Sequence, residues 1–87
     1  MAKLRLENDG DTLLGIYVEP WGRDYRLKPS EAVVIVTEDT AHSGQPFSVV
    51  THDQGMSVWA ESGHWAEVYD AAGTALECGH QRPDAAD

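Results

Sequence analysis

Three turns that end in glycine divide the second half of this chain into short apolar segments. Gly55, Gly63 and Gly73 each close a polar turn, and the segments between them alternate apolar and polar residues. A period of two is typical of a β-strand with one buried face, and no segment shows the 3.6-residue period of a helix. The sequence therefore predicts an all-β fold built largely from hairpins.

The same alternation predicts about eight short strands in one domain. In chain order these strands contain Leu4, Ile16, Tyr25, Ile35, Val49, Val58, Val68 and Leu76. The β-branched run Val33–Val36 is typical of a strand that is buried on both faces. We expect an antiparallel β-sandwich or flattened barrel over residues 1–81, because one face of the hairpins needs a covering sheet. Residues 82–87 are expected to form a flexible C-terminal tail.

The glycine turns also predict a register. Asp70 and Gly73 suit a three-residue hairpin loop in which Asp70 pairs with Thr74. The same geometry at the other two turns predicts a C-terminal four-strand meander. It sets Trp59 opposite Trp65, Glu67 opposite Glu77, and His64 opposite His80. The predicted core face carries Val50, Met56, Val58, Ala60, Ala66, Val68, Leu76 and Cys78.

The opposite face of the meander is the first candidate site. It combines the aromatic residues Trp59, Trp65 and Tyr69 with the carboxylates Glu67 and Glu77. Such a face favours contact with a protein partner or a second copy, because buried aromatic side chains dominate interface energies. Three alternatives remain: cover by a loop of the same chain, a flat small ligand, and acid–base catalysis by the carboxylate pair.

A second candidate is a metal site. His64, Cys78 and His80 would converge at one end of the predicted sheet, and thiolate and imidazole ligands suit zinc or copper. The competing interpretation is a buried reduced cysteine beside two half-exposed histidines. The chain otherwise carries no cofactor motif, so no other cofactor is expected.

Charge limits the classes of partner. The formal net charge is −9, and no lysine or arginine occurs between Lys28 and Arg82. An acidic surface repels phosphate backbones, so we expect no nucleic-acid partner. It favours cations or a basic protein partner, and the competing interpretation is that the charge only keeps a small protein soluble. No apolar run has the length of a membrane helix, and the single cysteine fits a reducing compartment. These features predict a cytoplasmic protein without membrane contact.

One segment resembles a known pattern. Glu19-Pro20-Trp21-Gly22, followed by Tyr25, Leu27 and Pro29, is similar to a motif of small uncharacterised bacterial β proteins. Ser30 stands where that pattern usually has glycine. The resemblance implies an all-β fold and carries no activity, cofactor or partner.

Overall fold

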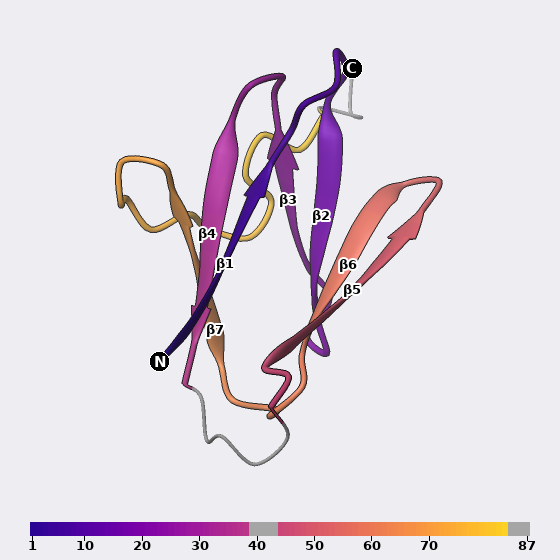
Figure 1. The fold of residues 1–87 in the computed structure, drawn as a ribbon. Helices are drawn as coiled ribbons and strands as arrows, with labels where there is room; N and C mark the ends of the chain where they lie inside the picture. Colours follow the sequence, from indigo (N-terminus) through magenta and orange to yellow (C-terminus); the bar gives the residue numbers. More distant parts are fainter. Residues whose placement is uncertain (39–43, 84–87) are drawn as a thin grey trace.

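A computed structural model describes residues 1–38 and 44–83 of the chain. The described residues form seven β-strands and no helix (Figure 1). In chain order the strands are β1 (Ala2–Glu7), β2 (Leu14–Glu19), β3 (Arg23–Leu27), β4 (Ala32–Thr37), β5 (Phe47–His52), β6 (Gly55–Ala60) and β7 (Ala66–Asp70). The predicted all-β class is confirmed, with seven strands in place of about eight.

The strands form two sheets that pack face to face. Sheet A has the order β1-β4-β7, and sheet B has the order β3-β2-β6-β5. Side chains from both sheets share one core: Ile16, Val18, Tyr25, Leu27, Val33, Ile35, Val58, Ala60, Ala66 and Val68. This arrangement is a small β-sandwich, as the alternating pattern predicts.

The predicted meander is wrong in its central pairing. β6 and β7 belong to different sheets, so Trp59 does not lie opposite Trp65. After β6 the chain crosses to sheet A, where Thr37 at the end of β4 holds it. Its hydroxyl donates to the carbonyl oxygens of His64 and Trp65, at 3.2 and 3.0 Å. These bonds attach the start of β7 to sheet A.

Sheet B is not purely antiparallel. β6 runs parallel to β2, with Ile16 paired to Met56 and Val18 to Val58. Side chains alternate between the two faces of a strand whichever way the neighbouring strand runs, so the sequence pattern does not distinguish parallel from antiparallel neighbours. The remaining strand pairs are antiparallel.

The hairpin of β5 and β6 has a shorter loop than predicted. His52 pairs with Gly55, so two residues form the loop and Val49 faces Val58. A shift of one residue turns every β5 side chain to the other face. Val50, predicted in the core, is therefore 52% exposed, and Phe47 packs against the core instead.

The last predicted strand is reduced to one bridge. Tyr69 pairs with Ala75, and the Asp70 amide donates to the Thr74 carbonyl oxygen at 2.9 Å, as the three-residue loop requires. The chain then leaves β7 and crosses to β3, where His80 pairs with Tyr25. Residues 75–82, here called the closing segment, thus span the two sheets along one side (Figure 1).

Candidate functional site

An exposed tryptophan is the clearest feature of the molecular surface. Trp65 precedes β7 and is 53% exposed. The Trp21 ring lies 4.9 Å from it, centroid to centroid, with a tilt of 57°. The Arg23 guanidinium carbon lies 4.2 Å from the Trp65 ring centroid, which is cation–π geometry. Trp65 is thus held in place while much of its surface remains in water.

Arg23 is itself fixed by sheet A. It donates to the Ala66 carbonyl oxygen at 2.6 Å, and a second guanidinium nitrogen lies 3.8 Å from Glu67 Oε1. The same carboxylate oxygen accepts the Trp65 indole N–H at 2.9 Å. Because β3 supplies the arginine and β7 the carboxylate, the cluster joins the two sheets. We call Trp21, Arg23, Trp65, Glu67 and Glu77 the Trp65 surface.

An open cleft of about 780 Å³ lies beside this cluster. Its walls include Arg23 and Glu67 from the strands and Glu77, Cys78 and His80 from the closing segment. The structure therefore brings Glu67 and Glu77 to one cleft, although they do not form a pair in a sheet. The predicted pairing fails because the closing segment leaves β7 soon after Leu76.

Two of the predicted binding residues lie elsewhere. Trp59 is on β6 in sheet B, beside Glu19 of β2, and is 42% exposed. Tyr69 faces Val34 of β4 and lines a separate cleft with Lys3. The five residues predicted as one face therefore divide: Glu67 and Glu77 line the cleft, and Trp65 lies beside it through its hydrogen bond to Glu67.

The predicted metal ligands are not brought together. Within residues 1–38 and 44–83, no group of three histidine, cysteine, aspartate or glutamate residues could hold a metal ion. His64 lies in the connection from β6 to β7, and His80 pairs with Tyr25 on β3. Cys78 is exposed rather than in the core. The reason is again the path of the closing segment, which carries Cys78 to Asp24.

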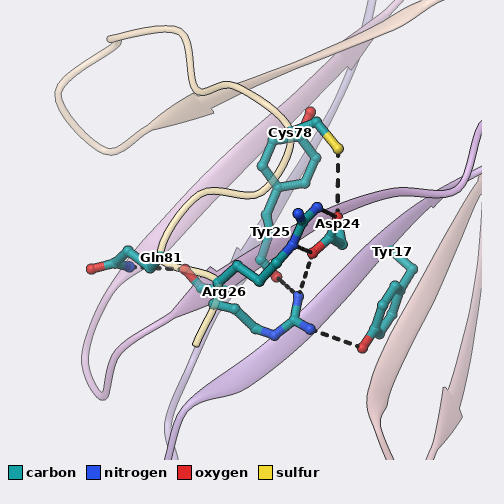
Figure 2. A network of polar contacts seen from close by, with 7 residues as sticks. Tyr17, Asp24, Tyr25, Arg26, Cys78 and Gln81 are labelled. Atoms are coloured by element: carbon teal, nitrogen blue, oxygen red, sulfur yellow. Dashed lines mark hydrogen bonds and ion pairs between the residues drawn. The ribbon is translucent and has the colours of Figure 1, made fainter. Parts of the chain in front are cut away.

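Asp24 is the centre of a polar network that the sequence analysis missed (Figure 2). Its carboxylate accepts hydrogen bonds from Arg82 through two guanidinium nitrogens and from Arg26 at 3.0 Å. The Cys78 thiol donates to it at 3.5 Å. The hydrogen bonds from Arg82 are the main cause that holds the pKa of Asp24 well below its usual range, although burial opposes them.

A second carboxylate stabilises the same end of the closing segment. Glu31 Oε1 accepts the Gln81 side-chain amide and the Lys28 backbone N–H, both at 2.7 Å. The hydrogen bond from Gln81 is the first cause that lowers the pKa of Glu31. Arg82 is the only lysine or arginine after Lys28, and this isolation was the signal in the sequence that could have indicated an ion pair.

No protein-family model matches this chain, and searches of the curated proteins and of the solved structures return no match. The part of the chain that the structure describes contains no helix long and apolar enough to cross a membrane.

Proposed function

We propose that this chain is a small non-enzymatic binding module that acts through protein contact at the Trp65 surface. The observation that supports this proposal most is the half-exposed Trp65 ring, which contacts to Trp21 and Arg23 hold in place. Ordering an aromatic side chain before binding lowers the entropic cost of association. Tryptophan and arginine are also the residue types that most often dominate interface energies.

The charges around Trp65 favour a basic partner. Glu67 is half-buried and Glu77 is exposed, and both border the cleft beside the ring. The chain as a whole carries a net charge of −9. A partner that places an apolar side chain on Trp65 and a lysine or arginine near Glu77 would match both features. We further propose a cytoplasmic location, which the free thiol of Cys78 supports.

Trp65→Ala tests the proposal, and Trp59→Ala is its matched control. Both residues are exposed tryptophans, but they lie in different sheets. Extract from the source cells is passed over immobilised wild-type protein and each variant, and retained proteins are identified by mass spectrometry. We expect one partner to bind wild type and Trp59→Ala, and to bind Trp65→Ala at least about 30-fold more weakly.

Circular dichroism and thermal unfolding establish that both variants are folded. The proposal is contradicted if Trp65→Ala retains every protein that wild type retains, and also if none of the three proteins retains a partner. Light scattering of the wild type over a range of concentrations identifies self-association at this surface, which Trp65→Ala would then abolish.

A further inference from the structure

The two sheets have four edge strands, and three of them are protected. Unpaired edges expose backbone N–H and C=O groups that can pair with another chain, so proteins cover or charge them. β1 places Lys3, Arg5 and Glu7 at alternate positions. β7 is bridged by Ala75, and the Leu76 N–H donates to the Val68 carbonyl oxygen at 2.8 Å.

The closing segment protects β3 in the same way. Gly79 N–H donates to the Asp24 carbonyl oxygen at 2.6 Å, and Arg26 N–H donates to the His80 carbonyl oxygen at 2.8 Å. Each protected edge therefore has either charged side chains or backbone partners from residues 75–82.

β5 has neither protection among the described residues. It forms one edge of sheet B, and its sequence Phe-Ser-Val-Val-Thr-His has no lysine, carboxylate or proline. Val49 and Val50 are 44% and 52% exposed, and Trp59 lies on the neighbouring strand β6. These three residues are half of the large hydrophobic residues that the described surface exposes.

Carboxylates lie at both ends of this edge. Asp53 directly follows β5. At the other end, Glu61 donates its N–H to the carbonyl oxygen of Pro46, the residue before β5, at 3.0 Å. Both acidic residues are exposed. The six residues of β5 span about 20 Å at about 3.3 Å per residue, so the edge is an uncharged strip between two negative ends.

We propose that the β5 edge binds an extended peptide segment of a partner protein by β-strand addition, and that this segment has a β-branched centre and a lysine or arginine at each end. Backbone hydrogen bonds to β5 supply the affinity, as in other strand-addition complexes. Asp53 and Glu61 select the basic ends. This surface is separate from the Trp65 surface, so the inference goes beyond the proposed function.

The charge pattern disfavours a second copy of the chain as the occupant. If two β5 strands paired antiparallel about a two-fold axis, Asp53 of one copy would approach Glu61 of the other. Like charges directly across a strand pair are destabilising, and each copy carries a net charge of −9. A basic segment converts the same carboxylates into attractive contacts.

The test uses two synthetic octapeptides with the same Thr-Val-Thr-Val-Thr-Val centre, one with lysine and one with glutamate at both ends. Each is titrated into ¹⁵N-labelled protein and followed by NMR. We expect the lysine peptide to shift the backbone amides of β5 and the indole N–H of Trp59, and to slow hydrogen exchange of the β5 amides. Two surface ion pairs make its affinity about tenfold higher than that of the glutamate peptide.

Two variants test the residues. Asp53→Asn with Glu61→Gln removes both charges without a change of shape, and we expect it to lose the tenfold preference. Val50→Lys charges the edge and should abolish binding of the lysine peptide, whereas Trp65→Ala should bind it as wild type does. If Val50→Lys fails to fold, the neutralised double variant still decides.

Three results would overturn the inference. They are equal affinity for the two peptides, amide shifts confined to β7 and the cleft, and a wild-type dimer in light scattering that buries β5. None of these results bears on Trp65→Ala in the partner experiment, so the two proposals fail separately.

Discussion

Ser30 has a φ of 73°, in the left-handed region that disfavours residues with a Cβ atom. It lies in the turn between Lys28 and Glu31, where the Glu31 N–H donates to the Lys28 carbonyl oxygen at 3.0 Å. We expect Ser30→Gly to raise the free energy of unfolding by about 1 kcal/mol, because glycine adopts this φ without strain.

Urea denaturation of purified protein measures this change. Ser30→Ala is the control, because alanine keeps the Cβ atom and should give no gain. A Ser30→Gly variant less stable than wild type would show that the turn is not strained.

Asp24 makes stability depend on pH. The folded-state pKa of its carboxyl lies below the usual value of about 3.9, mainly through hydrogen bonds from Arg82. The ionised form therefore stabilises the fold. This contribution is complete above the unfolded-state pKa, and it is lost as pH falls through the folded-state pKa.

Asp24→Asn removes this contribution. We expect the variant to be about 2 kcal/mol less stable than wild type at pH 7, because a charged acceptor of several hydrogen bonds is lost. The difference should shrink as pH falls below about 4. Thermal unfolding from pH 7 to pH 2.5 measures it, and a constant difference would contradict the role of the charge. Glu31, whose pKa is also lowered, is present in wild type and in the variant. Its contribution to acid sensitivity is therefore the same in both proteins.

The β5–β6 hairpin depends on close contact between two glycines. A Cβ atom on Gly55 would overlap the carbonyl group of Gly15 on β2, and Gly55 also has a φ of 132°. Gly73 has a φ of 90°, but a Cβ atom there would meet nothing within 4 Å. Comparing an alanine substitution at each position therefore distinguishes the cost of steric overlap from the cost of backbone strain alone.

We expect Gly55→Ala to cost at least about 3 kcal/mol of unfolding free energy, and Gly73→Ala about 1 kcal/mol. Chemical denaturation of both variants measures the costs. Equal costs would mean that β6 shifts to accommodate the extra atom. If Gly55→Ala does not fold, it will be missing from the soluble fraction while Gly73→Ala is folded. This result would also show that the substitution at Gly55 costs more stability than the one at Gly73.

At the scale of strands, local patterns predicted the core face and one hairpin loop, and failed for the other hairpin loop and for the pairing between hairpins. The alternation around Val58 and Val68 placed both residues in the core, where they are. The Asp70–Thr74 loop was also correct, because aspartate and glycine at fixed positions specify one turn. The two-residue loop before Gly55 was missed, because contact with Gly15 comes from a distant strand.

The candidate site shows the same limit. Trp65 lies directly before β7 and Glu67 lies in it, two residues along the chain, so their proximity followed from the sequence. Arg23 and Trp21 join them only because β3 and β7 lie on the same side of the sandwich. Pairing between distant segments depends on the whole fold, and the local sequence contains no sign of it.

For the whole molecule, the closing segment determines how far the chain can be shortened. The tail was predicted to begin at Arg82, yet Arg82 binds Asp24, and residues 84–87 lie outside the described residues. A chain that ends at Pro83 keeps this ion pair, and a chain that ends at Gln81 loses it.

We expect the chain that ends at Pro83 to keep the stability of the longer protein, and the chain that ends at Gln81 to unfold at a lower temperature at pH 7, because it lacks the Arg82 hydrogen bonds to Asp24. Thermal unfolding of the two shortened proteins gives the comparison. Equal stability would show that Arg26 alone satisfies the Asp24 carboxylate. Arg82→Ala in the longer protein separates loss of the side chain from the effect of a new terminal carboxylate.

The interleaved strand order also has a consequence for biosynthesis. During synthesis, β2 can pair with β6 only after β6 has emerged. In the same way, β4 needs β7, and β3 needs the closing segment. A nascent chain that has emerged only as far as β4 therefore contains an unfinished part of each sheet and no complete core. Because non-local pairing of this kind is slow and leaves apolar strands exposed meanwhile, we expect the growing chain to be most prone to aggregate before β6, β7 and the closing segment have emerged. Its native form is reached only after residue 82 has been synthesised.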